Sequence, residues 1–248
     1  GGREHALALA CHRDPEVAAV HVAPGNPGTA SFATNHPLDP CDCDAVVSLA
    51  RGLEADLVVV GPEAPLVAGV ADALRESGID CFGPSAEAAQ LEGSKAFAKE
   101  VMAAARVPTA ASRSCDDANS VSAALDEFGP PYVVKDDGLA GGKGVVVTHD
   151  RAEALAHAKR CFESDHRVVV EEYLDGPEVS LFAICDGTRA LPMQPAQDFK
   201  RVGNGGVGPN TGGMGAYTPL PWAPDDLVET VSTTIISPTL RAMADRGT

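Results

Sequence analysis

Short apolar runs alternate with amphipathic helical stretches over the first ninety residues of the chain. Each strand-like run ends in a turn that contains Gly or Pro. This repeated strand–loop–helix pattern is typical of an open parallel sheet, which binds ligands in loops at the carboxyl ends of its strands. The predicted strands are 18–22, 57–60 and 81–82, and the predicted helices are 44–54 and 67–76.

The pattern changes at Ser94. Helical and strand-like runs here predict a small α+β unit in which two strands flank a glycine-rich loop. A further strand, a second glycine-rich loop and a final helix complete the chain. The predicted helices are 95–105, 116–128, 151–162 and 225–243; the predicted strands are 132–135, 144–148, 168–171 and 179–185; the second loop is 201–217.

Composition narrows the possible partners. With 44% hydrophobic and 22% charged residues, the 248-residue chain has enough apolar residues for one large domain or two smaller ones. A net charge of −16 argues against a broad basic face for nucleic acid, and no apolar run is long enough to cross a membrane. Seven Cys without a Cys-x-x-Cys pair favour reduced thiols in the cytoplasm and indicate no metal site.

The first glycine-rich loop follows Lys135 and ends at Gly144. It is not a Walker A loop, because Asp137 and Gly144 occupy positions that need Gly and Ser or Thr. A glycine-dense hairpin with a lysine can still close over phosphates, although a mobile hairpin with a solvated lysine is the simpler interpretation. Lys135 favours the phosphate hypothesis, because a lysine at a strand end beside such a loop needs an anionic partner.

The second glycine-rich segment contains G-x-G-x-x-G at Gly203, Gly205 and Gly208. We reject a dinucleotide-binding fingerprint there, because Pro209 follows and no helix opens. The neighbouring polar residues suit a small phosphorylated or zwitterionic ligand. The acidic stretch 171–178 taken alone predicts a surface turn.

Taken in order, the motifs resemble those of the phosphoribosylamine–glycine ligase (glycinamide ribonucleotide synthetase) family. The resemblance spans the whole chain with family-like spacing. The matching motifs are G-G-R-E-H-A-L, A-P-G-N-x-G-T, V-G-P-E-A-P-L, F-G-P, L-E-G-S-K-A-F, K-x-D-G-L-A-x-G-K-G, E-E-Y-L-D-G, Q-D-F-K-R-V-G and G-P-N-T-G-G-M-G-A-Y.

The resemblance implies an α/β and α+β chain: an amino-terminal open parallel-sheet substrate domain at 1–93, then an incomplete ATP-grasp domain at 94–248 with a lid at about 114–176. It implies ATP-dependent ligation of glycine to 5-phosphoribosylamine through a glycyl phosphate, in de novo purine biosynthesis. The implied cofactors are ATP with Mg²⁺ or Mn²⁺. The implied partners are these small molecules, with no nucleic acid, no membrane and no indication of oligomeric state.

The resemblance also implies roles for individual residues. Lys135 and Lys143 are the implied catalytic residues. The implied ATP-binding residues are Lys95, Lys135, Gly138, Gly141, Gly142, Lys143, Gly144, Glu171, Glu172, Tyr173, Leu174 and Glu178. The implied substrate-binding residues are Gly2, Arg3, Glu4, Asn26, Glu63, Asp198, Lys200, Arg201, Asn210, Thr211, Gly212, Gly213 and Met214.

The sequence departs from the family pattern in three places. The family's first strand is absent before Gly1, and the chain stops at Thr248, before the family's Mg²⁺ ligands; we therefore name no metal ligand and expect little or no ligase activity from this chain alone. The third departure is local: Asp136, Asn204 and Gly206 replace usual family residues. The Asp136 carboxylate either weakens the attraction of Lys135 for phosphate or points away from it.

Three other hypotheses remain. The first is a different ATP-grasp enzyme, such as a biotin-dependent carboxylase subunit or another purine-pathway carboxylate–amine ligase. The second is a truncated, non-catalytic module that binds ATP or a sugar phosphate. The third, a nicotinamide oxidoreductase, depends on the rejected G-x-G-x-x-G.

Overall fold

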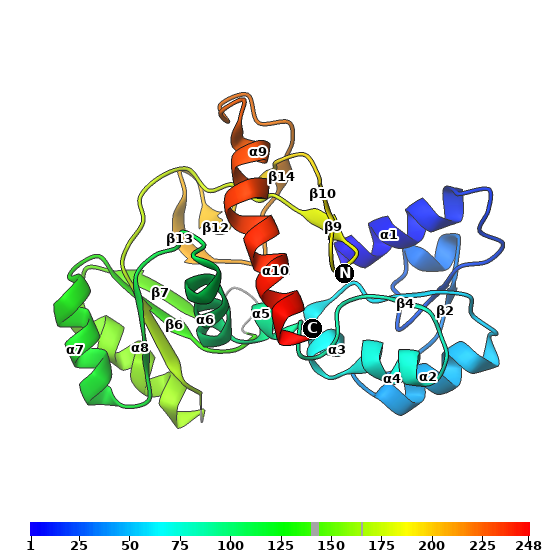
Figure 1. The fold of residues 1–248 in the computed structure, drawn as a ribbon, viewed down its shortest axis with the longest axis horizontal. Coiled ribbons are helices and arrows are strands. Elements are labelled where there is room, and N and C mark those ends of the chain that lie inside the picture. The colour runs from blue at the N-terminus through cyan, green and yellow to red at the C-terminus, as the bar shows by residue number, and fades with distance from the viewer. Residues whose placement is uncertain (140–143, 165) are drawn as a thin grey trace. The chain divides into compact units, whose positions relative to one another are not determined.

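Contacts within the chain divide it into two compact units, Gly1–Gly93 and Ser94–Thr248. The computed structural model describes residues 1–139, 144–164 and 166–248. Each unit has buried clusters of its own. Figure 1 shows the ribbon with its elements labelled in chain order.

Parallel strand pairs form the sheet elements of the first unit. β1 pairs with β2 and β3 pairs with β4, both in parallel. The parallel pairing is as predicted, although β1 and β3 are shorter than predicted and β2 was missed. The elements are α1 (Gly2–Arg13), β1 (His21–Val22), a 3-10 turn (Thr29–Ser31), β2 (Thr34–Asn35), α2 (Cys43–Gly52), β3 (Val58–Val59), α3 (Glu63–Val67), α4 (Val70–Glu76), β4 (Cys81–Phe82) and α5 (Gln90–Gly93).

The single helix predicted over 67–76 is wrong. The chain forms α3 and α4 instead, because Gly69 has φ +92°, which lies outside the helical region. The turn lets α4 bury Val70 and Leu74 with Ala50 of α2. This packing supplies the core beneath the β3–β4 pair, and Val58 and Cys81 contribute to it.

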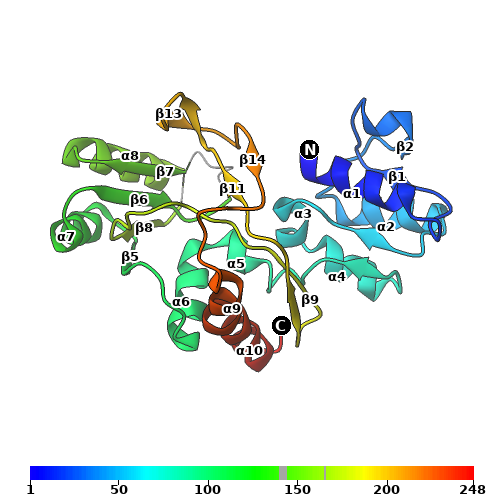
Figure 2. The same ribbon diagram turned by 90° about the horizontal axis from the view of Figure 1, so that it is seen from above.

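An antiparallel sheet in the order β5–β8–β6–β7 dominates the first part of the second unit. α7 and α8 pack along it, as Figures 1 and 2 show. Asp117 and Asp150 cap the two helices, each accepting a hydrogen bond from a backbone N–H of the first turn. The elements are α6 (Lys95–Ala105), β5 (Ser112–Cys115), α7 (Ala118–Phe128), β6 (Tyr132–Asp136), β7 (Val145–Thr148), α8 (Arg151–Glu163) and β8 (Val168–Glu171).

The two faces of this sheet differ in chemistry. Val134, Val168 and Val170 pack in one buried cluster with side chains of α7 and α8. Because successive strand residues point to opposite faces, Lys135 and Glu171 lie on the other face. The β6–β8 register aligns Lys135 with Val169 and Val133 with Glu171, so Lys135 and Glu171 are diagonal neighbours.

The second glycine-rich segment is not the loop that the sequence predicts. Arg201–Gly203 (β12) and Val207–Asn210 (β13) form a hairpin, and Ala216–Tyr217 (β14) pairs with Gln197–Asp198 (β11). Gly205 and Gly206 have φ of +76° and +72°, which turns the chain between β12 and β13. The G-x-G-x-x-G therefore forms a β-hairpin and opens no helix. The predicted strand 179–185 shortens to β9 (Ala183–Cys185), which pairs with β10 (Ala190–Pro192).

The final helical run extends from Leu227 to Arg246 but is not uniform. α9 (Leu227–Val231) continues through a π-helical turn (Ser232–Ile236) into α10 (Ser237–Arg246). Pro238 lies in the first turn of α10 and cannot donate a backbone hydrogen bond, which accounts for the irregular turn before it. α10 packs against α6, and the Arg246 guanidinium lies 5.3 Å from the ring centroid of Phe97.

Candidate functional site

The buried carboxylate of Glu171 lies between two lysines. Its Oε2 is 2.9 Å from Nζ of Lys135 and 3.4 Å from Nζ of Lys99. Glu171 is only 8% exposed at its side chain, whereas Lys135 is 27% exposed. Strands β8 and β6 position the first pair, and α6 supplies Lys99. The sequence named Lys135 and Glu171 but missed Lys99.

Hydrogen bonds fix Lys99. Besides its ion pair with Glu171, its ammonium donates to Oγ1 of Thr109 at 2.8 Å and to the carbonyl oxygen of Ala110 at 2.9 Å. Two of the three N–H donors of the ammonium are therefore used in hydrogen bonds, and the ion pair adds a third contact. Lys99 therefore has a defined position on the same face of the sheet as Lys135.

The amino terminus of α6 is attached to the start of the first glycine-rich loop. Ser94 caps the helix, and the Asp137 carboxylate accepts hydrogen bonds from the Ser94 hydroxyl at 3.2 Å and from the backbone N–H of Ala96 at 3.1 Å. Lys95 donates from Nζ to the carbonyl oxygen of Gly138 at 2.8 Å. The structure thereby places Lys95 beside the loop that the sequence predicted to cover phosphates.

The loop itself connects β6 to β7, as predicted. The N–H of Asp136 donates to the carbonyl oxygen of Gly144 at 2.7 Å, and Nε2 of the buried His157 lies 3.2 Å from the same oxygen. The predicted residues Gly141, Gly142 and Lys143 lie outside the described residues.

Asp136 does not compete for Lys135. Its Oδ1 pairs with Nδ1 of His166 at 2.8 Å, whereas Lys135 pairs with Glu171. The two neighbours in β6 therefore point to opposite faces of the sheet, as a strand requires. The sequence left two placements open for the Asp136 carboxylate, and in the structure it points away from Lys135.

The predicted ATP-binding residues Glu172, Tyr173 and Leu174 continue directly from β8. The N–H of Glu172 donates to the carbonyl oxygen of Ala111 at 2.9 Å, and Oε1 of Glu172 accepts from the N–H of Ala111 at 2.9 Å. Glu172 therefore extends the β5–β8 pairing. The side chains of Tyr173 and Leu174 are exposed.

The predicted ATP-binding residue Glu178 and the predicted substrate-binding residue Lys200 form an ion pair. Nζ of Lys200 contacts Oε1 of Glu178 and lies 3.8 Å from Oδ1 of Asp198. Both side chains of the Lys200–Glu178 pair are exposed, so water screens it strongly. The structure therefore joins residues that the sequence assigned to different ligands.

Most other predicted substrate residues of this unit hold the hairpin together. Arg201 donates to the carbonyl oxygen of Gly208 at 2.7 Å, and its backbone pairs with Asn210. Thr211 donates from its hydroxyl to the Lys200 carbonyl oxygen at 2.9 Å and accepts from the N–H of Gly213 at 3.1 Å. Gly212 lies in the same turn, and the Met214 side chain is exposed.

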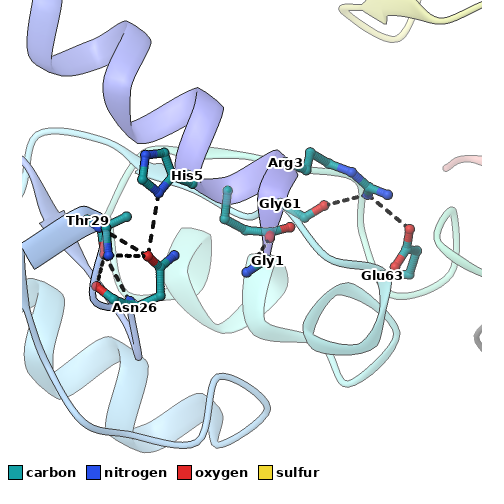
Figure 3. A network of polar contacts seen from close by, with 9 residues as sticks. Gly1, Arg3, His5, Asn26, Thr29, Gly61 and Glu63 are labelled. Carbon is teal, nitrogen blue, oxygen red and sulfur yellow. Dashed lines mark hydrogen bonds and ion pairs between the residues drawn. The ribbon is translucent and has the colours of Figure 1, made fainter. Parts of the chain in front are cut away.

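In the first unit, Arg3 reaches from α1 to the start of α3. Figure 3 shows its guanidinium directed at the carbonyl oxygen of Gly61 and the carboxylate of Glu63. The guanidinium nitrogen lies 3.0 Å from the Gly61 oxygen and 2.9 Å from Oε1 of Glu63. The pKa of the Glu63 carboxyl lies below its ordinary value, mainly because the carboxyl accepts a hydrogen bond from the backbone N–H of the same residue. The hydrogen bond from Arg3 lowers the pKa further, and burial partly opposes the shift. Glu4 lies on the same helix, with its side chain against Gly61, and Gly2 begins that helix.

Asn26 organises the loop after β1. Its Oδ1 accepts hydrogen bonds from the N–H groups of Gly28 at 2.8 Å and Thr29 at 3.1 Å, and Nδ1 of His5 lies 3.5 Å away (Figure 3). Nδ2 of Asn35 donates to the Asn26 carbonyl oxygen at 2.8 Å. The sequence predicted Asn26 but missed Thr29 and Asn35, which join this loop to β2.

Other features do not coincide with the predicted residues. A cavity of about 280 Å³ is lined by Asp116, Phe162, His166 and Arg167, on the side of the sheet that Asp136 faces. Within residues 1–139, 144–164 and 166–248, no group of three or more His, Cys, Asp or Glu side chains is arranged to hold a metal ion. In the same residues, no helix combines the length and apolar character needed to cross a membrane.

Some signals in the sequence pointed to the missed residues. Ser94 stands three residues before the N–H that it caps, and Asp137 lies inside the K-x-D-G motif. Lys99, Thr109 and His157 carry no such signal, because their contacts join different elements or loops and follow no local spacing rule.

Both units match models of one enzyme family. Residues 1–92 match the phosphoribosylglycinamide synthetase N domain, and residues 93–248 match its ATP-grasp (A) domain. The whole chain is 62% identical to phosphoribosylamine–glycine ligase of Streptomyces coelicolor and 57% identical to that of Mycobacterium leprae. The chain covers 59% and 60% of the length of these relatives.

Solved structures agree with this relationship. A phosphoribosylamine–glycine ligase from Thermotoga maritima superposes with a TM-score of 0.84 at 30% identity, covering all of this chain and 60% of that one. An N5-carboxyaminoimidazole ribonucleotide synthetase from Thermus thermophilus has the same fold, with a TM-score of 0.72 at 21% identity over 99% of this chain and 62% of that one. The chain belongs to the phosphoribosylglycinamide synthetase family, with that family's N domain followed by residues of its ATP-grasp domain.

Proposed function

We propose that this protein uses ATP to join glycine to 5-phosphoribosylamine, giving glycinamide ribonucleotide, ADP and phosphate. The observation that carries the proposal is the order of the two matches, the N domain and then the ATP-grasp domain of one synthetase family, along a single chain. We place the reaction in de novo purine biosynthesis in the cytoplasm. The seven free cysteines support a reducing compartment.

The chemistry requires activation of glycine. Direct displacement from a carboxylate would expel oxide, so the γ-phosphoryl group of ATP first moves to a glycine carboxylate oxygen and ADP leaves. The amine of phosphoribosylamine then attacks the carbonyl carbon of glycyl phosphate, phosphate departs with the bonding electrons, and the nitrogen loses a proton. The protein has to orient the reactants, neutralise charge on the phosphoryl group and exclude water.

The described residues support assignment of the nucleotide phosphates to Lys95 and Lys135. Both ammonium groups lie in the second unit at strand or helix ends next to the glycine-rich loop. Lys143, which lies outside the described residues, remains part of the same proposal. Residues 114–176 are the proposed lid, because β5, β6 and β8 share one core with α7 and α8, and β7 belongs to the same sheet.

Adenine recognition is proposed for the segment after β8. The N–H of Glu172 already bonds to Ala111, so the backbone of Tyr173 and Leu174 is the better candidate to meet the base.

Lys200 and Glu178 form an ion pair that ribose hydroxyls or a substrate anion must open. We assign substrate binding in the first unit to Arg3, Glu63 and the loop around Asn26.

Mg²⁺ or Mn²⁺ accompanies ATP in the proposal and supplies charge neutralisation when bound. The described residues do not offer a cluster of ligands for it. We therefore assign no metal ligand in this chain.

A two-part assay tests the function. Calorimetry should detect ATP binding to the chain. Because we expect little or no ligase activity from this chain alone, the coupled assay of ADP release uses the chain extended by the remaining residues of the Streptomyces coelicolor relative, and it should respond only when glycine and phosphoribosylamine are both present. ADP release that needs bicarbonate, or that is indifferent to glycine, would contradict the proposal and favour a different ATP-grasp enzyme. ATP binding without any substrate-dependent ADP release would instead favour a binding module.

A further inference from the structure

We propose that Lys99 is a positioning residue of the nucleotide-phosphate site: a second counter-ion that holds Glu171 when Lys135 turns to a phosphate. The inference rests on the proposed function, which gives Lys135 its phosphate partner. Neither the sequence motifs nor the family resemblance gave Lys99 a role.

The cluster of Glu171, Lys135 and Lys99 has a net positive charge. One oxygen of Glu171, Oε2, receives both Lys135 at 2.9 Å and Lys99 at 3.4 Å. Two ammonium groups around one carboxylate leave one positive charge in excess. The cluster therefore attracts a phosphate even though a carboxylate lies at its centre.

The two lysines differ in freedom. The Lys99 ammonium donates hydrogen bonds to Thr109 and Ala110 and pairs with Glu171, and its side chain is 14% exposed. Lys135 is 27% exposed, and its one partner within the described residues is Glu171. Lys135 is thus the lysine able to turn toward a ligand, and Lys99 is the lysine that stays.

Burial of Glu171 makes the second lysine necessary. A buried carboxylate that loses its counter-ion is strongly destabilised, so Lys135 alone would be held at Glu171. Lys99 keeps a cation beside the carboxylate after Lys135 leaves. It therefore strengthens phosphate binding without touching the phosphate.

Calorimetric titration with ATP tests this arrangement. Lys99→Met should weaken binding about tenfold, and Lys99→Arg should bind ATP within about threefold of the wild type because it keeps the charge. In a Glu171→Gln background, Lys99→Met should change ATP affinity by less than about threefold, because the neutral amide side chain needs no counter-ion. Lys159→Met removes a 78%-exposed lysine of α8 and should bind ATP as the wild type does.

A purely structural role for Lys99 predicts a different result. In that case Lys99→Met would weaken ATP binding equally in the wild-type and Glu171→Gln backgrounds, which would overturn the inference. Unchanged ATP binding by Lys99→Met would overturn it as well.

A nucleotide-free measurement separates this inference from the proposed function. In thermal unfolding, the double variant Lys99→Met/Lys135→Met should lose more Tm than the sum of the losses in the two single variants. Adding Glu171→Gln to the double variant should remove this excess loss. Additive losses would show that the lysines do not share Glu171 and would overturn the inference. If the wild type does not bind ATP but the double variant still shows the larger-than-additive loss of Tm, the proposed function and the phosphate role of Lys99 are both overturned. The sharing of Glu171 by the two lysines would then still be supported.

Discussion

The hydroxyl of Thr29 ties the loop after β1 to β2. Its Oγ1 accepts the N–H of Asn26 at 2.9 Å and lies 2.8 Å from Oδ1 of Asn35, and Thr29 is fully buried. The loop also carries Asn26, a proposed substrate residue. A single buried hydroxyl therefore fixes the shape of a candidate substrate loop.

Thr29→Val should destabilise the first unit by about 1–3 kcal/mol, because it keeps the shape but leaves buried polar groups without a partner. Urea unfolding measures the loss. Ser31→Ala removes an exposed hydroxyl of the same turn and should cost less than about 0.5 kcal/mol. Equal losses for the two variants would contradict the assigned role of Thr29.

Individual site residues were predictable to different degrees. The motif K-x-D-G drew attention to Lys135, and strand alternation alone allowed Asp136 to point away from it. The Lys99–Glu171 contact was not predictable, because it joins a helix to a strand far along the chain. Residue type and spacing identify a charged group, but only the fold identifies its partner.

At the scale of elements, Asp137 links the glycine-rich loop to α6. Asp137→Ala should cost about 1–2 kcal/mol of stability, as loss of a helix cap does, and should also weaken ATP binding by releasing the loop from Lys95. Asp150→Ala removes the cap of α8 and is a matched control. It should lose similar stability and keep wild-type ATP affinity by calorimetry; a parallel loss of affinity would refute the link.

The β12–β13 hairpin offers a second test. A Cβ at Gly203 would lie 2.9 Å from the carbonyl oxygen of Val207, whereas a Cβ at Gly212 would meet nothing within 4 Å. Gly203→Ala should therefore cost about 1–3 kcal/mol in urea unfolding, and Gly212→Ala should cost less than about 0.5 kcal/mol. The opposite order of losses would show that the hairpin does not need its close backbone contact.

Several elements between Lys95 and Glu171 were predicted well, whereas the strands after Cys185 were not. The sequence predicted α6, α8, β6 and β8 within a residue of their observed ends, since their apolar positions repeat regularly. Strands β12 to β14 have two to four residues, have no apolar run like that of β8, and lie in the glycine-rich segment that was predicted as a loop; β10 and β11 were not predicted. The Asn204-Gly205 pair was the available signal for a hairpin turn.

For the whole molecule, the division into two units has a measurable consequence. Because each unit has its own core, ATP should protect amides of the second unit in hydrogen exchange, above all near Lys95, Lys135 and Glu171. Peptides from the core of the first unit, such as those with Val70 and Leu74, should exchange at the same rate with and without ATP. Protection confined to the first unit would contradict the placement of the nucleotide.

The sequence predicted the architecture of both units but not all of its details. Strand–loop–helix alternation correctly indicated parallel pairing in the first unit, although short strands and the turn at Gly69 were missed. The net charge of −16 is compatible with a phosphate site, because lysines gather at Glu171 and at Gly138. A strongly negative net charge argues against a broad basic surface, but it is compatible with such local clusters of lysines.

The alternation of Lys135 and Asp136 in β6 also protects the sheet against misfolding. If β6 slipped by one residue against β8, the side chains of β6 would exchange faces, and the carboxylate of Asp136 would face buried Glu171 in place of the ammonium of Lys135. Repulsion between two carboxylates would replace an ion pair, and Lys135 would turn toward the valines packed under α7 and α8. The opposite charges of Lys135 and Asp136 thus penalise the nearest wrong register of the strand.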